Sequence, residues 1–208
     1  MENNNQTINV KHITMEPSAL GLFGLAMVTL VASSQKLELT HGVAGVLPWA
    51  IFLGAIAQLI AAAYDAKHDN TFGATAFFAY GLFWLGVGMT WLISNGLFGE
   101  AFQATYDPHE LAFAYVGYFI FTMIMTIAAT ETSKLLFIIF CLIDVLFLGL
   151  FLTTFGVMEH ATHMLAAFAE LAIAIVSFYG VAANILNHHF GYKFLPIGKP
   201  FGIFKKHN

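Results

Sequence analysis

Six long runs of nearly uncharged residues dominate this chain of 208 residues. They lie at about 18–33, 43–64, 73–94, 111–129, 135–156 and 161–186, and runs of about 18 or more apolar residues are long enough to cross a bilayer as helices. The chain is 59% hydrophobic and only 10% charged, whereas soluble domains usually carry about 25% charged residues. The sequence therefore predicts an all-α membrane protein with a bundle of six transmembrane helices.

The six runs leave little room for a separate soluble domain. The predicted organisation is an N-terminal tail at 1–17, a six-helix transmembrane domain at 18–186 and a C-terminal tail at 187–208. The connections between runs are short and polar, and the longest of them is NGLFGEAFQATYDPHE at 95–110. The chain shows no convincing internal repeat.

Lysine placement predicts the orientation of the spans. All eight basic residues are lysines, and only Lys36 falls on the side opposite the two termini. Because lysine-rich flanks of spans stay in the cytoplasm, we expect a multi-pass protein of the cell membrane with both termini cytoplasmic. The net charge of −4 and the confinement of lysines to one side give no indication of nucleic-acid binding.

Small residues are unusually frequent in the third run, where residues 71–84 read TFGATAFFAYGLFW. Gly73, Ala76 and Tyr80 follow the i, i+3, i+7 spacing of one helix face. Small residues let the backbones of membrane helices approach closely. Two interpretations remain open: the face packs tightly against another helix, or it lines a narrow passage that Tyr80 gates.

Polar residues interrupt several runs, namely Gln58, Asp144, Glu170 and Asn184. A carboxylate at mid-membrane costs roughly 2.5–3.5 kcal/mol on insertion scales, so such groups usually face the bundle interior or water. Asp144 and Glu170 are therefore either acids hydrogen-bonded to a neighbouring helix or proton carriers in a passage. Gln58 either holds helices together or contacts a substrate.

A metal site or enzyme centre is the alternative from a different class. Glu159, His160, His163 and Glu170 lie close in sequence, and His160 and His163 share a helix face. However, EHATH is not the HExxH zinc motif, and no second histidine-rich helix complements it. No cofactor or resident metal is expected, and a purely structural multi-span protein is a third possibility.

Four ordered stretches resemble the acetate uptake transporter family, also called succinate–acetate permeases. They are EPSALGLFGLAM at 16–27, FLGAIAQL at 52–59, NTFGATAFFAYGLFW at 70–84 and FGYKFLPIG at 190–198. The likeness extends over nearly the whole chain. It implies a homohexamer in which each protomer has its own narrow pore through the six-helix bundle.

The resemblance also implies site residues. A hydrophobic constriction in this family would fall at Leu25, Tyr80 and Ile143, with leucine here where an aromatic residue is usual. A selectivity position on the sixth helix would fall at Ser177. At the start of the first helix, Glu16 and Ala19 replace the asparagine and the second proline of the family signature.

We therefore predict a non-enzymatic channel or proton-coupled permease for acetate and related small monocarboxylates, with succinate as a further candidate. Its partners are the carboxylate substrate and the lipid bilayer. Residues that bind the substrate or select among substrates are expected to be Thr75, Gln58, Asn184 and Ser177. Hydrogen-bond donors are expected at helix N-termini and from Thr75, Tyr80 and Asn184. Asp144 and Glu170 are the possible proton carriers. Anion access is expected at the N-terminus of the first helix, where free N–H groups attract negative charge; its residues are Glu16, Ser18, Ala19 and Leu20.

Overall fold

The computed structural model describes residues 15–204, which form the six predicted helical spans. The first is α1 (Ser18–Lys36), and the second is continuous through α2 (Leu47–Trp49), η1 (Ala50–Ala57) and α3 (Gln58–Lys67). The remaining spans are α4 (Thr71–Ser94), α6 (Pro108–Ala129), α7 (Lys134–Thr154) and α8 (Glu159–Phe190), while the short α5 (Glu100–Ala104) lies in the longest connection. The all-α, six-span prediction is confirmed, although α8 continues beyond the predicted residue 186.

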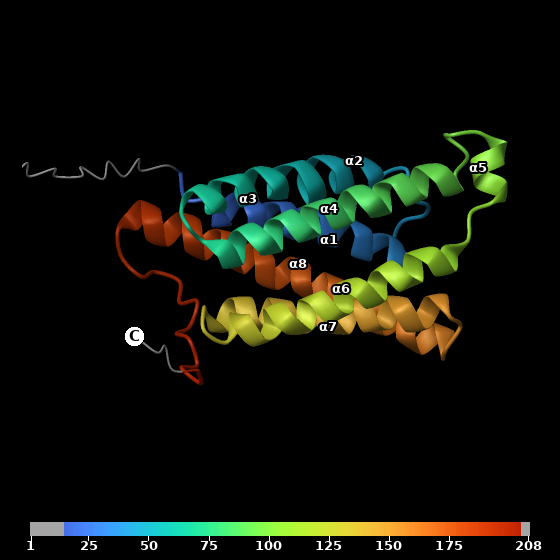
Figure 1. The fold of residues 1–208 in the computed structure, drawn as a ribbon. Coiled ribbons are helices and arrows are strands. Elements are labelled where there is room, and N and C mark those ends of the chain that lie inside the picture. Colours follow the sequence, from blue (N-terminus) through green and yellow to red (C-terminus); the bar gives the residue numbers. More distant parts are fainter. Residues whose placement is uncertain (1–14, 205–208) are drawn as a thin grey trace, which may run out of the picture.

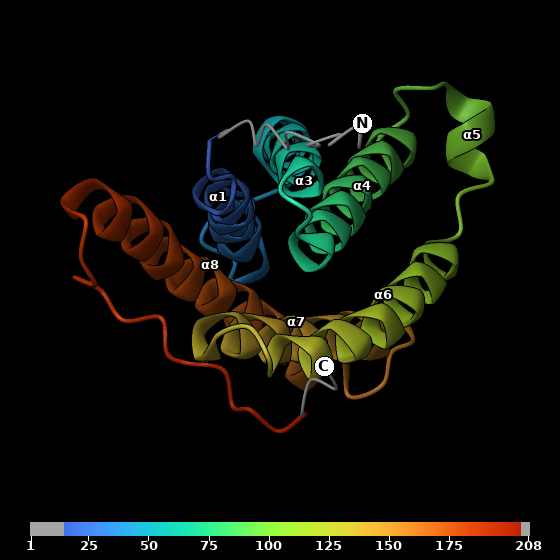
Figure 2. The same ribbon diagram turned by 60° about the vertical axis from the view of Figure 1, so that its left-hand side comes forward.

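The spans lie side by side with their long axes roughly aligned (Figure 1). In Figure 2, α8, α7 and α6 form a curved row, and α1, α3 and α4 lie against its concave side. Helix α8 packs along both α1 and α7, and α4 packs along α3. The described chain begins and ends at the same end of the bundle (Figure 1), which is called the terminal end below.

Polar side chains define where the helices begin and end at the terminal end. The Asn70 side chain accepts a hydrogen bond from the Gly73 backbone N–H (3.2 Å) at the start of α4. The Ser133 hydroxyl accepts one from the Leu136 N–H (3.2 Å) at the start of α7. These caps satisfy N–H groups that have no partner inside the helix. Gly191, with φ +72°, ends α8 in the left-handed conformation that favours glycine.

The second span contains an eight-residue π-helical segment, η1, between two α-helical pieces. Small residues allow other helices to approach this segment closely. A side chain on Gly24 of α1 would collide with the Leu53 carbonyl of η1, and one on Gly54 would press into the Trp84 ring of α4. The glycines therefore bring α1, η1 and α4 together, as expected for small residues in membrane helices.

The segment after α8 folds back across the α6–α7 connection. The Ile197 carbonyl accepts a hydrogen bond from the Leu135 N–H (3.0 Å), and the Phe201 N–H donates to the Thr130 carbonyl (2.8 Å). This docking brings Ile197 into the wall of the internal cavity described below.

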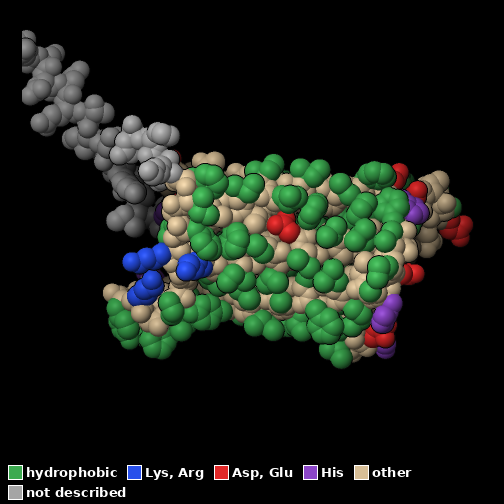
Figure 3. Space-filling model, turned by 90° about the horizontal axis from the view of Figure 1, so that it is seen from below, with side chains coloured by type: hydrophobic (Ala, Val, Ile, Leu, Met, Phe, Trp, Pro, Cys, Tyr) green, Lys and Arg blue, Asp and Glu red, His purple; other side chains and the backbone are tan. Residues whose placement is uncertain are grey.

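The outer surface is apolar over most of its length. Figure 3 shows hydrophobic side chains covering one long face, with lysines gathered at the terminal end and histidines at the opposite end. Bulky side chains such as Phe113, Ile124 and Phe168 are well exposed on this surface. Such an apolar surface is the one expected of helices that contact lipid or other membrane helices.

Candidate functional site: an internal cavity closed by an apolar ring

A cavity of about 220 Å³ runs from the terminal end into the bundle. Ser18, Asn70 and Ser133 lie in its outer wall, at or next to the starts of α1, α4 and α7. Leu25, Tyr80 and Ile143 lie seven to ten residues further along the chain, on the same three helices. At 1.5 Å of rise per residue, they are roughly 10–15 Å deeper.

Leu25, Tyr80 and Ile143 thus come together at the inner part of the cavity, and we call them the apolar ring. Their exposed fractions are 7%, 5% and 3%, and all three belong to the hydrophobic core. The family resemblance predicted these three positions as a constriction. The structure places them around one cavity, and their role in limiting passage stays a prediction.

The Tyr80 side chain is held in place by groups on α6 and α7. Its hydroxyl shares a hydrogen bond with the Thr122 hydroxyl (2.9 Å), and both groups are buried. Its ring packs against Phe121 and Phe140 at centroid distances of 5.9 and 6.1 Å. The Tyr80 hydroxyl is therefore engaged with Thr122, and the ring is the part of the side chain that narrows the cavity.

The predicted small-residue face of the third span is part of this cavity. Gly73, Ala76 and Tyr80 all contribute to its wall. Gly73 also serves packing, because a side chain there would collide with the carboxylate of Asp65. The two interpretations of the face are therefore compatible. Its small residues allow the Asp65 side chain to pack closely, and they also leave room for the cavity.

Two polar side chains in the cavity wall carry unpaired atoms. Gln58 is 0% exposed, and neither its amide nitrogen nor its amide oxygen has a hydrogen-bond partner among the described residues. Asp65 is 2% exposed, and its Oδ1 accepts a hydrogen bond from the Asn70 amide (2.7 Å), while its Oδ2 is unpaired. Among the wall residues within 15–204, Asp65 is the only one that carries a formal charge.

Sequence reasoning did not identify Asp65, because it lies at the polar end of the second run. A signal was present, since Asp65 follows Gln58 by seven residues and therefore shares its helix face. Asn184 of α8 was predicted as a substrate contact and does line the cavity, as does Ser18.

The start of α1 differs from the expected site of anion access. Glu16 is exposed, and its carboxylate accepts a hydrogen bond from the Ser18 N–H (3.0 Å). The chain's own carboxylate thus occupies part of the helix N-terminus. Ser18 lines the cavity, whereas Ala19 and Leu20 are half-buried beside it. The starts of α1, α4 and α7 nevertheless converge at the outer wall, and helix N-termini favour negative charge.

Three other predicted residues lie outside the cavity wall. Thr75 is exposed on the outer surface of α4. Ser177 is fully buried in α8, and its hydroxyl has no partner among the described residues. Asp144 is half-buried, and its Oδ2 accepts a hydrogen bond from the Thr126 hydroxyl of α6 (2.7 Å). Asp144 is thus bonded to a neighbouring helix, which was one of its two interpretations.

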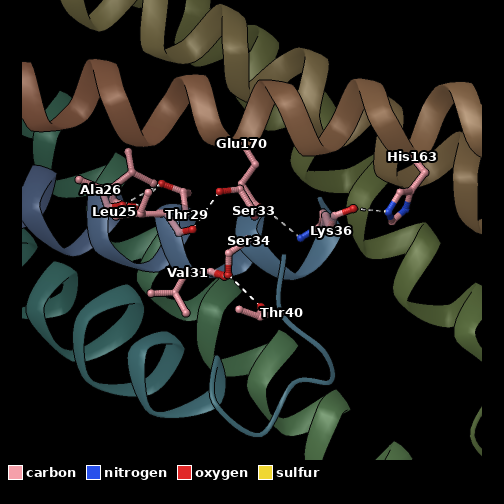
Figure 4. A network of polar contacts seen from close by, with 11 residues as sticks. Leu25, Ala26, Thr29, Val31, Ser33, Ser34, Lys36, Thr40, His163 and Glu170 are labelled. Carbon is pink, nitrogen blue, oxygen red and sulfur yellow. Dashed lines mark hydrogen bonds and ion pairs between the residues drawn. The ribbon is translucent and has the colours of Figure 1, made fainter. Parts of the chain in front are cut away.

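Glu170 forms an ion pair that the sequence did not reveal. Its Oε2 lies 2.9 Å from the Lys36 ammonium group, and the two side chains are 2% and 14% exposed (Figure 4). Lys36 lies beyond the predicted first run at 18–33, but α1 continues to this residue and carries it against α8. His163 also lies here, with its Nε2 2.9 Å from the Lys36 carbonyl oxygen. This pair lies at the end of α1 opposite the cavity mouth.

The residues proposed for the alternative metal site are engaged separately. Glu170 pairs with Lys36 and His163 contacts the Lys36 backbone, while Glu159 and His160 are exposed. Within the described range 15–204, no group of three or more His, Cys, Asp or Glu side chains is placed to hold a metal ion. The chain therefore presents its internal cavity, rather than a ligand cluster, as the candidate site.

A bundle of six apolar spans with an internal cavity that ends at an apolar ring defines a multi-pass helical membrane protein with a pore-like interior. Residues 2–199 match the GPR1/FUN34/yaaH family, and the chain belongs to this family. The resemblance inferred from the four sequence stretches is thereby confirmed.

Relatives match over most of the chain. The succinate-acetate/proton symporter SatP of Escherichia coli K12 is 29% identical over 184 residues, covering 88% of this chain and 95% of the relative. The ammonia transport outward protein 2 of Saccharomyces cerevisiae is 28% identical, covering 87% of this chain and 65% of the relative. The solved structure of the bacterial acetate channel SatP has a TM-score of 0.82 and 28% identity, covering 89% of this chain and 100% of that one.

Proposed function

We propose that this protein moves acetate and related small monocarboxylates across a membrane, as a channel or a proton-coupled permease. Succinate is a further candidate substrate. The observation that carries the proposal is the cavity itself, which leads from three helix N-termini to the ring of Leu25, Tyr80 and Ile143. Membership of a family whose relatives include proteins named for acetate transport supports the same function.

The dimensions and chemistry of the cavity suit a small carboxylate. A water molecule takes up about 30 Å³ in the liquid, so about 220 Å³ accommodates acetate together with a few waters. Helix N-termini at the mouth favour a negatively charged group. The apolar ring disfavours hydrated ions, because it offers no polar groups to replace their water. Gln58 and Asn184 supply the polar contacts in the wall.

The proposed assembly is a homohexamer in the cell membrane, with one pore per protomer and both termini in the cytoplasm. The family resemblance supports the hexamer, and the exposed bulky apolar side chains offer surface for contacts between protomers. The gathering of lysines at the terminal end supports the cytoplasmic assignment (Figure 3). Mass measurement of the detergent-solubilised protein tests the hexamer, and labelling of cysteines introduced near each terminus tests the orientation.

Uptake by proteoliposomes tests the transport function. We expect radiolabelled acetate to enter vesicles containing the purified protein faster than protein-free vesicles, with succinate measured in parallel. A proton gradient should accelerate uptake if protons cross with the substrate, and it should have no effect beyond passive diffusion if the protein conducts the acetate anion alone. Equal uptake by the two kinds of vesicle under every gradient would refute the proposal.

A further inference from the structure

Gln58 has a buried amide whose hydrogen-bonding atoms are both unpaired. Gln58 is 0% exposed, and its Nε2 and Oε1 atoms have no hydrogen-bond partner among residues 15–204. Leaving a buried donor or acceptor unsatisfied costs stability, whereas an apolar residue of similar shape would avoid that cost. A side chain of this kind in a cavity wall indicates a partner that arrives from outside the chain.

Gln58 lies at the inner end of the cavity, beside the apolar ring. A Cβ added to Gly24 would lie 3.3 Å from the Gln58 Cγ. The Gln58 side chain therefore lies at the same depth in the bundle as Gly24 and the adjacent Leu25. Gln58 is also the first residue after η1. Short π-helical segments inside helices occur frequently at functional sites. A solute that reaches the ring from the terminal end therefore comes next to the Gln58 amide.

The charges around Gln58 do not favour an anion at this depth. The nearest formal charge in the cavity wall within the described chain is the carboxylate of Asp65, and no lysine contributes to that wall. An anion that loses water at the ring would meet apolar side chains without a compensating positive group, which is costly in a low-dielectric interior. A neutral solute avoids this cost.

A primary amide is the hydrogen-bonding complement of an undissociated carboxylic acid. Its N–H donates to the carbonyl oxygen of the acid, and its oxygen accepts the acid O–H, so both unpaired atoms are satisfied at once. A carboxylate ion only accepts hydrogen bonds, so it would leave the Gln58 oxygen unpaired and place it near a second negative atom. The pairing thus distinguishes the two protonation states of one substrate.

We infer that Gln58 binds the substrate of this cavity as the undissociated carboxylic acid, through a two-point pair between the amide and the carboxyl group. This inference rests on the proposed function and specifies the form in which a small monocarboxylate passes the apolar ring. No covalent step is involved, because the acid takes up its proton before it reaches Gln58 and releases it after leaving.

Binding to the purified protein tests the inference without requiring transport. Acetamide is neutral and presents an adjacent donor and acceptor, as acetic acid does, whereas methanesulfonate is a permanent anion of similar size. Each ligand is titrated against the thermal unfolding midpoint, since a ligand that binds the folded state raises it. We expect acetamide to stabilise the protein at every pH in a series, and methanesulfonate to do so only weakly.

Gln58→Met removes the amide and keeps a side chain of similar size. Gln103→Met makes the same chemical change on the exposed α5 helix and serves as the control. In Gln58→Met, about tenfold more acetamide should be needed for the same stabilisation, which corresponds to ~1.4 kcal/mol. The midpoint of this variant without ligand should equal or exceed that of the wild type, because an unpaired buried amide is removed. Gln103→Met should bind acetamide as the wild type does.

Two results would overturn the inference. One is stabilisation by methanesulfonate equal to or greater than that by acetamide. Another is unchanged acetamide binding in Gln58→Met. If Gln58→Met does not fold, the comparison of the two ligands on the wild-type protein still decides the matter. Absence of acetate uptake in proteoliposomes with acetamide binding retained would instead refute the proposed transport function.

Discussion

The ion pair between Lys36 and Glu170 should be a major contributor to the association of α1 with α8. The two charges lie 2.9 Å apart, and the Glu170 side chain is 2% exposed. Removing one partner of a buried pair leaves an uncompensated charge, and this typically costs about 3–5 kcal/mol. We therefore expect Lys36→Met to destabilise the protein by about that amount.

The expected shift in unfolding temperature follows from the size of the chain. A loss of 1 kcal/mol lowers the midpoint by about 2–4 °C for proteins of 150–250 residues, so Lys36→Met should lower it by roughly 6–20 °C. The matched control is the double variant Lys36→Met with Glu170→Gln, which removes both charges together. It should recover most of the loss, because replacing a whole buried pair by neutral groups is often close to neutral.

Thermal unfolding of the four proteins in detergent completes a double-mutant cycle. The four are the wild type, each single variant and the double variant, with Lys134→Met at the terminal end as a control for losing a lysine elsewhere. A loss below about 1 kcal/mol in Lys36→Met would be typical of a solvent-exposed pair and would refute the argument from burial. A double variant as unstable as Lys36→Met would refute it as well.

Three further predictions concern the ring, the mid-membrane acid and the start of α6. Tyr80→Ala should raise uptake of longer monocarboxylates relative to acetate. Tyr80→Phe keeps the aromatic side chain and loses only the hydrogen bond to Thr122, so it should retain selectivity at a stability cost of about 1 kcal/mol. Asp144→Asn should preserve assembly and leave the pH dependence of acetate uptake unchanged, measured as initial rates corrected for passive diffusion, because Asp144 lies outside the cavity wall and bonds to Thr126. Hydrogen bonds from the backbone N–H and the side chain of His109 hold the pKa of Asp107 below its ordinary value of 3.8. The ionised Asp107 therefore stabilises the folded protein fully above pH 3.8, and this stabilisation is lost as the pH falls through the lowered pKa. Asp107→Asn still caps α6 and should therefore weaken the acid-induced fall in the unfolding midpoint while leaving the neutral value nearly unchanged.

Each of these predictions has a distinct contrary outcome. Equal substrate preference in Tyr80→Ala and the wild type would make Tyr80 a packing residue only. A flattened pH profile in Asp144→Asn would instead make Asp144 a proton carrier in transport. If the unfolding midpoint of Asp107→Asn falls at acid pH as much as that of the wild type, then protonation of Asp107 does not contribute to the acid-induced loss of stability.

The small-residue face could be predicted because it depends on position within a single helix. Gly73, Ala76 and Tyr80 share a face by helical periodicity alone, and the structure places all three in one cavity wall. Leu25 and Ile143 came from the family resemblance. Thr75 was predicted as a substrate contact but points to the outer surface, because spacing along one helix does not tell which face turns inward.

The sequence by itself determined the six spans, their order and the family, since long apolar runs and short motifs are local properties of the chain. Only the tertiary structure decided that Lys36 meets Glu170 across 134 residues, that Asp144 bonds to Thr126, and that Asp65 enters the cavity wall. The reason is the solvent: in a bilayer both the lipid-facing and the buried sides of a helix are apolar, so hydrophobicity does not fix its rotation. The rotation is set by close packing between helices, and packing brings these charged and polar groups to their partners.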